Sequence, residues 1–402
     1  MSETLRLPLP AEGPLEPPAA WAELRRECPV ATVRLPSGDE ATFLTRYDDV
    51  RALLSDPRFA RPTSQDGAAR LAPEGAGGPV VDGELHDVVP DRGEGHQRWR
   101  RQVGKYFTAK RMTALRPSIT ERADRLVDAM LEQGQPAELK GAFGFPLPVS
   151  VICTILGVPA EDAGRFSHWS DAFLNVSRWT KAESAAAYTE FDAYMSRHIA
   201  GVRARPGDDL LSMLIADASG GEEGVSDAWL LRTGMGLLVA GHETTANAIG
   251  KTVAMLLADR TRWERLLAQP ELVRTTVDEA LRLDVNLGFG LRRYLTDDVE
   301  VGGETLPRGA TVVCALPAAN RDATVFEDPD EMLLSRSPNP HLAFGAGPHA
   351  CLGQSLARTE LQVALEVLLR RLPTLRLAVP VGELRRVEGL LVGGLSEVLV
   401  AW

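Results

Sequence analysis

The chain has 402 residues, of which 44% are hydrophobic and 25% charged, and its formal net charge is -11. This composition is typical of a well-packed globular protein and excludes a disordered or collagen-like chain. The acidic balance argues against general nucleic-acid binding, which requires a basic surface.

The four cysteines, Cys28, Cys153, Cys314 and Cys351, stand far apart in the sequence. They lack the paired spacing of zinc sites and of secreted disulfide frameworks, so a reducing cytoplasm is the simplest location. The N-terminus has no basic start followed by an apolar core, and no stretch is apolar over the ~20 residues that cross a bilayer. We therefore expect a soluble cytoplasmic protein. Length alone does not decide the number of domains.

Short helices and strands are predicted in the first part of the chain. We expect helices at residues 21–27 and 48–54, and strands at 31–35 and 41–44 around the turn Ser37-Gly38-Asp39. Residues 56–95 are rich in Gly, Pro and Asp and show little periodicity. A long irregular segment inside a compact protein is usually functional.

Residues 94–107 are predicted to form a helix, in which His96 and Arg100 share one face because they are four residues apart. No acidic residue occurs from 97 to 111, a stretch that holds Arg98, Arg100, Arg101, Lys105, Lys110 and Arg111. Such a basic patch is either a solvated helix face or a docking surface for an acidic partner, since opposite charge steers encounter.

Helical spacing continues at residues 119–132, 147–156, 161–176 and 182–204, with a shorter segment at 209–216. The longest apolar helix then runs from residue 226 to about 259. Gly241 at its centre costs roughly 1 kcal/mol relative to Ala, which a close approach of another group would explain. His242 and Glu243 begin a zinc-protease motif, but Ala246 stands where the second histidine is required, so we reject that function.

Pro270 begins another predicted helix, in which Glu279 and Arg282 are three residues apart and can pair on one face. By itself, such a pair is an ordinary surface ion pair that contributes little to stability. Short strands are expected between residues 293 and 316, and again in the C-terminal stretch from 375 to 402.

The sequence FGAGPHACLG, residues 344–353, comes directly before a run with leucines at helical spacing that ends at Pro373. Backbone N–H groups at a helix N-terminus lower the pKa of a nearby thiol, so Cys351 is placed to act as a thiolate metal ligand. Gly345, Gly347 and Gly353 permit close approach, so a large flat ligand such as a haem fits against the loop. The alternative is a glycine-rich turn with an inert, buried cysteine.

These ten residues resemble the haem-binding loop of the cytochrome P450 family, whose pattern is Phe-Gly-x-Gly-x-His-x-Cys-x-Gly. The sequence fills every specified position of that pattern. The long apolar helix also resembles the central helix of the family, where an acid followed by a threonine lies above the iron. Glu243 and Thr244 match that pair.

The resemblance implies roles for residues along the chain. Cys351 would ligate the haem iron, and the haem would also be bordered by Phe344, Gly345 and Gly353. Its propionates would be bound by His96, Arg100, Arg293 and His349. Ala240 and Gly241 would leave space for O2, and Glu243 and Thr244 would deliver protons. The alternative for Thr244 is a hydroxyl bonded to the backbone one turn earlier.

A structural network and a substrate pocket are implied as well. In the network, Glu279 and Arg282 are joined by Arg336, although Met332 replaces the usual aromatic residue. The pocket would be capped by residues 56–95 and bordered by Gly236, Val239, Ala240, Phe289, Leu291 and Leu391.

The implied fold is mainly α (α+β), a single domain over residues 1–402 with a large helical part and a smaller strand-rich region. Haem b would lie between the central helix and the Cys351 loop. The implied enzyme is a monomeric monooxygenase that activates O2 with electrons from NAD(P)H through a ferredoxin and its reductase. It would hydroxylate an apolar or aromatic small molecule in secondary-metabolite biosynthesis. The ferredoxin would dock on the basic patch, and we expect no nucleic-acid or membrane partner.

Three other functions stay open at this point, of which a purely structural protein that binds no haem is the weakest. Some members of the resembling family couple aromatic rings or dehydrogenate their substrates, and Trp169, Phe173, Trp179 and Phe289 could cradle an aromatic molecule. The alternative of another class is a haem-binding sensor without turnover. The pair Glu243 and Thr244 argues against a sensor, because a sensor needs no proton delivery.

Overall fold

The computed structural model describes residues 5–59, 61, 65–82, 90–219, 225–283 and 288–402. Part of the expected cap at residues 56–95 therefore lies outside the described residues. No helix in the described part of the chain is long and apolar enough to cross a membrane.

Helices dominate the chain, and apolar residues at helical spacing account for them. They are α1 (Ala20–Glu27), α2 (Tyr47–Ser55), α3 (Pro79–Asp82), α4 (Gly93–Gly104), α5 (Ala109–Ala114), α6 (Arg116–Gln133), α7 (Pro146–Leu156), α8 (Ala163–Phe173), α9 (Lys181–Ala204), α10 (Leu210–Ser219), α11 (Asp227–Ala258), α12 (Arg260–Ala268), α13 (Val273–Leu283), α14 (Leu316–Ala319) and α15 (Gln354–Arg371). A π-helical turn, Lys140–Gly144, precedes α7.

The strands are short. They are β1 (Leu5–Arg6), β2 (Val30–Arg34), β3 (Glu40–Leu44), β4 (Ala137–Glu138), β5 (Leu291–Tyr294), β6 (Val299–Val301), β7 (Glu304–Leu306), β8 (Thr311–Cys314), β9 (Arg376–Leu377) and β10 (Leu399–Ala401). Within the described residues they form a five-stranded sheet of order β1-β2-β3-β8-β5, a three-stranded sheet of order β4-β10-β9, and the hairpin β6-β7.

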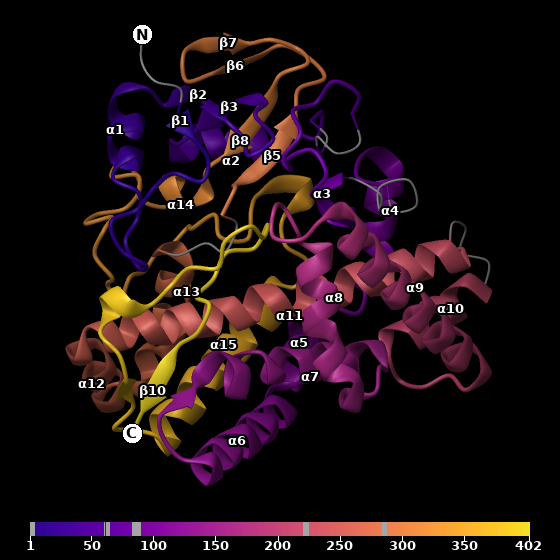
Figure 1. Ribbon diagram of the computed structural model, residues 1–402, viewed down its shortest axis with the longest axis vertical. Coiled ribbons are helices and arrows are strands. Elements are labelled where there is room, and N and C mark those ends of the chain that lie inside the picture. The colour runs from indigo at the N-terminus through magenta and orange to yellow at the C-terminus, as the bar shows by residue number, and fades with distance from the viewer. Residues whose placement is uncertain (1–4, 60, 62–64, 83–89, 220–224, 284–287) are drawn as a thin grey trace.

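Helix α11 is the axis of the helical part, and in Figure 1 it crosses the middle of the molecule with the five-stranded sheet above it. The Ser226 hydroxyl caps its N-terminus by accepting a hydrogen bond from the Trp229 N–H. Helices α7, α9 and α15 pack against α11, and their apolar side chains form the largest hydrophobic cluster. This packing buries the apolar faces of the long helices, which stabilises them.

The five-stranded sheet has a hydrophobic cluster on each face. Val312 and Val313 are adjacent on β8, yet they belong to different clusters, because strand side chains alternate between the two faces. In the antiparallel pairing of β5 with β8, Arg293 lies opposite Val312 and Arg292 opposite Val313. The two arginines therefore point to opposite faces of the sheet.

The predicted long helices are present, with ends that differ from the expected ones by a few residues. The structure adds β1, which pairs in parallel with β2, and also α5 and α12. Elements this short carry too little periodicity to be predicted. In the described C-terminal stretch, the expected strands are limited to β9 and β10, with isolated bridges such as the one between Arg386 and Leu395.

Candidate active site

The loop at residues 344–353 holds a fixed bend in front of α15. The Cys351 N–H donates to the Phe344 carbonyl at 2.8 Å, and the Gly345 N–H donates to the Leu342 carbonyl at 2.8 Å. Gly353 is the N-cap of α15, and its N–H hydrogen-bonds the Cys351 thiol. The Cys351 side chain is exposed, which does not match the alternative of an inert cysteine buried in a turn.

The electrostatics of the thiol differ from the expectation. Although the Cys351 residue is exposed at its surface, the protein atoms around the sulfur desolvate the thiol and raise its pKa above the ordinary value, while the Gly353 N–H and the charges of Arg100 and Arg358 lower it by less. The helix N-terminus was expected to lower the pKa of the thiol, and for the protein alone this net direction is wrong, because burial outweighs the donors. A cation bound to the sulfur favours the thiolate.

Asp278 of α13 ties the two ends of the cysteine loop together. Its carboxylate accepts a hydrogen bond from Arg358 Nε at 2.8 Å and lies 3.3 Å from Nε2 of His341, which precedes the loop. Arg358, on α15, also stacks on the Phe344 ring with its Cζ 4.5 Å from the centroid. The bend of the loop is therefore fixed from the α13 side and from the α15 side.

Glu279, the next residue of α13, holds the segment that leads to the loop. Its fully buried carboxylate accepts hydrogen bonds from Arg282 Nε and Nη2, each at 2.8 Å, and from Arg336 Nε at 3.0 Å. The Leu333 N–H and the Asn339 amide donate to it as well. Burial raises the pKa of Glu279, but these donors more than offset that effect, so the pKa lies below its ordinary value.

An aromatic residue completes this network from an unexpected position. Met332 stands where an aromatic residue was expected, and it is buried with the helical cluster. The guanidinium of Arg282 stacks on the ring of Phe326, with its Cζ 5.1 Å from the centroid. Phe326 therefore supplies the aromatic contact from the segment after α14.

The residues expected to bind propionates come together in space. His96 and Arg100 lie one turn apart on α4, Arg293 comes from β5, and His349 comes from the cysteine loop. The rings of His96 and His349 stack with their centroids 4.3 Å apart. Burial, followed by the charges of nearby arginines, lowers the pKa of His96 to about 4 and that of His349 to about 3. Both rings are therefore neutral at pH 7.

Arg61 and Asp91 belong to the same cluster, and the sequence analysis missed them. The charge of Arg61 lowers the pKa of both His96 and His349, whereas Asp91 raises the pKa of His96. Arg61 and Asp91 lie in the irregular segment at residues 56–95, where no periodicity indicates the direction of a side chain. No sequence signal could have placed them.

This cluster fits the anionic side of a haem. Arg293 Nε and His349 Nδ1 are buried without a hydrogen-bond partner in the described residues, and burial lowers the pKa of Arg293 to about 10. A buried cation such as Arg293 requires an anion nearby, and the buried polar nitrogen of neutral His349 requires a hydrogen-bond partner. Two propionate carboxylates beside a thiolate ligand meet this requirement.

Two glycines serve packing between helices and loops rather than a ligand. Gly347 has a φ of +68°, and a Cβ there would lie 2.5 Å from Cα of Ser55, at the end of α2. A Cβ on Gly241 would lie 2.8 Å from the side chain of Ile152, because α11 and α7 approach closely there. Protein atoms fill both Cβ positions, so packing alone accounts for the two glycines, and the contact of Gly241 with a haem stays a prediction.

One face of α11 is open. Ala240 is exposed, and the position of a Cβ on Gly236 has no heavy atom within 4 Å. The Thr244 hydroxyl lies on the same face and donates to the Ala240 carbonyl at 2.9 Å, which is the backbone bond that the sequence analysis named as the alternative. Val239 is only 2% exposed and packs in the helical cluster, so the expectation that it borders a pocket is corrected.

Glu243 lies on the buried side of α11. Its Oε1 is 3.5 Å from Nε2 of His242, and its charge acts on Lys140 and Asp171. Burial raises the pKa of Asp171, and the charge of Glu243 raises it further. Asp171 pairs with Arg178 at 3.1 Å, and the Arg178 side chain is 50% exposed. Charged groups therefore lead from Glu243 toward the surface.

The remaining residues expected to border the substrate pocket fall into two places. Phe289 and Leu391 pack in the same hydrophobic cluster, and the Leu391 N–H donates to the Leu174 carbonyl at 2.8 Å. Leu291 lies beside the cysteine loop, because a Cβ on Gly345 would be 3.4 Å from Leu291 Cδ1.

The aromatic residues considered as a cradle are mostly core. Trp169 and Phe173 are 2% and 1% exposed, and Phe191 packs against both rings. Trp179 is only partly buried and lies against His168. The expectation that Trp169 and Phe173 contact an aromatic substrate is therefore corrected.

Comparisons with known proteins agree with this geometry. A sequence model of the family described as Cytochrome P450 matches residues 258–375. The mycinamicin IV hydroxylase/epoxidase of Micromonospora griseorubida is 44% identical over 384 residues, covering 95% of this chain and 94% of that protein. The nocardicin C N-oxygenase of Nocardia uniformis subsp. tsuyamanensis is 42% identical over 385 residues, with the same shares covered.

A solved structure shows the same fold. The LnmA cytochrome P450 hydroxylase from the leinamycin biosynthetic pathway of Streptomyces atroolivaceus S-140 superposes with a TM-score of 0.89 at 39% identity. The match covers 99% of this chain and 100% of that chain. The mainly helical fold with a smaller strand-rich region, expected from the sequence, is confirmed.

The Glu279 network generates a stability prediction. Glu279→Gln should lower the free energy of unfolding by about 3 kcal/mol or more, because it leaves the buried Arg282 without its full counter-charge. Urea unfolding measures this loss. The matched control is Glu264→Gln, which breaks an exposed pair with Arg260 and should cost less than about 1 kcal/mol. Equal losses in the two variants would contradict a structural role of the network.

Proposed function

Because the chain belongs to the cytochrome P450 family and is a haem-thiolate monooxygenase, we propose that it hydroxylates an apolar small molecule of secondary metabolism. The observation that carries this proposal is the exposed Cys351 thiol at the N-terminus of α15, beside a cluster of arginines and histidines. Relatives named hydroxylase/epoxidase, N-oxygenase and biosynthetic-pathway hydroxylase support the reaction class.

The chain provides the setting for the cofactor. Haem b, with O2 as co-substrate, would supply reductive oxygen activation, and the Cys351 thiolate would be its electron-donating ligand. Arg100, Arg293 and the rings of His96 and His349 would bind the propionates through charge-assisted hydrogen bonds. The unsatisfied Nε of Arg293 and Nδ1 of His349 are the atoms with free hydrogen-bonding capacity for this task.

Protons would reach the open face of α11 through Glu243 and Thr244. Asp171, whose pKa is raised by burial and by Glu243, can take up a proton near the exposed Arg178 and lies within the electrostatic reach of Glu243. The Thr244 hydroxyl lies on the open face of α11 and donates to the Ala240 carbonyl, and a hydroxyl oxygen has two lone pairs that accept hydrogen bonds. Glu243 is the buried acid and Thr244 lies on the face where O2 is expected, so the pair would carry protons from the one side of α11 to the other.

Electrons would come from NAD(P)H through a ferredoxin and its reductase, and we place the docking surface at Arg101 and Lys110. Both side chains are exposed, on α4 and α5. Two other members of the basic stretch are already engaged, since the charge of Arg100 acts on Cys351 and Lys105 pairs with Asp217 at 3.2 Å. The patch is therefore smaller than the sequence indicated.

This surface lies next to the cysteine loop. A Cβ on Gly104, the last residue of α4, would be 3.8 Å from Leu352 Cδ1, so the end of α4 contacts the residue after Cys351. Helix α5 packs against α15, the helix that follows the loop. An acidic donor bound at Arg101 and Lys110 would therefore have a short path to the thiolate side of the cofactor.

Hydroxylation is favoured over ring coupling and over a sensor. The burial of Trp169 and Phe173 removes the argument for aromatic ring coupling that rested on them. A sensor without turnover would not use the pathway from Asp171 through Glu243. Product analysis separates these outcomes, because hydroxylation adds one oxygen atom to the substrate, while coupling and dehydrogenation remove hydrogen only and a sensor forms no product.

The proton pathway predicts an uncoupled enzyme in Thr244→Ala. Haem content should be unchanged, whereas the product formed per NAD(P)H consumed should fall by roughly tenfold or more, with the electrons recovered as hydrogen peroxide. Thr244→Ser keeps the hydroxyl and should stay coupled. Coupled turnover by Thr244→Ala would show that the hydroxyl carries no proton.

The docking surface predicts a defect in electron transfer. Arg101→Glu combined with Lys110→Glu should slow reduction by ferredoxin at low salt by roughly tenfold and flatten its dependence on ionic strength. Stopped-flow absorption measures this rate. Arg308→Glu, at an exposed arginine between β7 and β8, is the control and should leave the rate unchanged. Equal rates in the double variant and the control would exclude this surface.

A further inference from the structure

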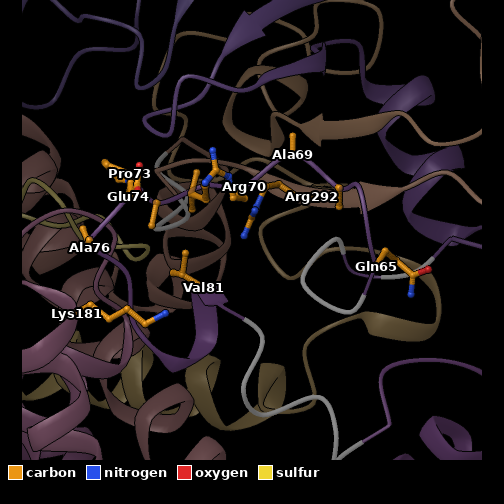
Figure 2. A pocket seen from close by; sticks show the side chains of 13 residues that line it. Gln65, Ala69, Arg70, Pro73, Glu74, Ala76, Val81, Lys181 and Arg292 are labelled. Atoms are coloured by element: carbon orange, nitrogen blue, oxygen red, sulfur yellow. The ribbon is translucent and has the colours of Figure 1, made fainter.

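A hollow of about 380 Å³ lies on the strand-rich side of the molecule, apart from the cysteine loop. Its walls come from the segment at residues 65–76, from Val81 of α3, from Lys181 at the start of α9 and from Arg292 of β5. Figure 2 shows Arg292 and Lys181 extending into the hollow from opposite sides. The volume is in the range of pockets that bind small organic molecules.

Arg292 is the unusual residue of this hollow. It points to the face of the sheet opposite Arg293, so it takes no part in the propionate cluster. No hydrogen bond or ion pair of its guanidinium is found in the described part of the chain. Burial lowers the pKa of Arg292 to about 10. A partly buried guanidinium without a counter-ion is costly unless a ligand supplies the negative charge.

The other charges of the hollow leave a positive surplus. Arg70 is neutralised by a two-pronged pair with Asp39, in which Nη2 lies 3.2 Å from Oδ1. Glu74 lines the hollow but is exposed to water, which screens its charge. Lys181, at the wall opposite Arg292, is also exposed, so water screens its charge like that of Glu74, and the surplus comes from the partly buried Arg292.

The apolar wall connects the hollow to the region expected to border the substrate. Val81 belongs to the same hydrophobic cluster as Phe289 and Leu391, and so does Leu71, another residue of the wall. A backbone bridge between Ala76 and Thr180 ties the wall to the start of α9. A molecule with an apolar body could therefore lie along this cluster with one end in the hollow.

We propose that this hollow is a carboxylate-binding subsite, in which Arg292 pairs with the acid group of an amphipathic substrate and Lys181 adds a second contact. The guanidinium fork matches a carboxylate in two hydrogen bonds, which selects it over a neutral group of the same size. This inference rests on the proposed function and narrows its substrate class to organic acids.

The test compares phenylbutyrate with its neutral analogue phenylbutanol on the haem-loaded protein by isothermal titration calorimetry. The unmutated protein should bind phenylbutyrate at least tenfold more tightly than phenylbutanol. Added salt should weaken the binding of phenylbutyrate and leave that of phenylbutanol unchanged. Arg292→Met should lose at least tenfold in affinity for phenylbutyrate and none for phenylbutanol. Arg292→Lys keeps the charge but loses the guanidinium fork. Its affinity for phenylbutyrate should lie between those of the unmutated protein and Arg292→Met. Arg308→Met, the exposed control, should bind both probes as the unmutated protein does.

The Tm of the variant distinguishes ligand binding by Arg292 from a purely structural role. Arg292→Met should have an unchanged or higher Tm, because the replaced guanidinium has no partner to lose. A lower Tm or an unfolded Arg292→Met variant would overturn the proposal, and so would equal affinity of the unmutated protein for the two probes. Calorimetry measures binding without oxygen chemistry. A negative result would therefore reject the carboxylate subsite and leave the proposed monooxygenase function untouched.

Discussion

Two adjacent carboxylates on α13 determine where the Cys351 thiol stands. Glu279 binds the backbone or side chains of Leu333, Arg336 and Asn339 in the segment before the cysteine loop. Asp278 then binds His341 before the loop and Arg358 after it. Because a buried carboxylate must keep its donors, this segment cannot shift without leaving charges unpaired. The loop conformation that exposes the thiol follows from that constraint.

Charge is distributed unequally around the candidate active site. Arg61, Arg100 and Arg293 gather with His96 and His349, and this surplus of cations suits the two carboxylates of a haem. The other polar group, behind the open face of α11, is balanced, because the acids Glu243 and Asp171 lie near Lys140 and Arg178. The cluster of arginines and histidines can hold a fixed anion. The balanced group around Glu243 can pass protons without acquiring a large net charge.

The sequence was informative where the pattern itself carries the chemistry. The cysteine pattern, the spacing of Glu279 and Arg282, and the position of Arg336 led to groups that meet in space. The long helices followed from the spacing of apolar residues, because burial of one helix face is what stabilises them.

Several failures share one physical cause, which is contact between segments far apart in the chain. Ile152 fills the space beside Gly241, and Ser55 fills the space beside Gly347, so neither glycine needed a ligand to explain it. Phe326 supplies the aromatic contact missing at Met332. Sequence spacing along one segment cannot reveal the neighbour that another segment provides.

The central claim is that Cys351 binds haem iron as a thiolate. The absorption spectrum of the reduced, CO-bound protein tests it most directly, because the position of the main band depends on the axial ligand. The account predicts the strongly red-shifted band of thiolate ligation in the unmutated protein and its loss in Cys351→His. A histidine-type band in the unmutated protein, or a red-shifted band that survives in Cys351→His, would contradict the account.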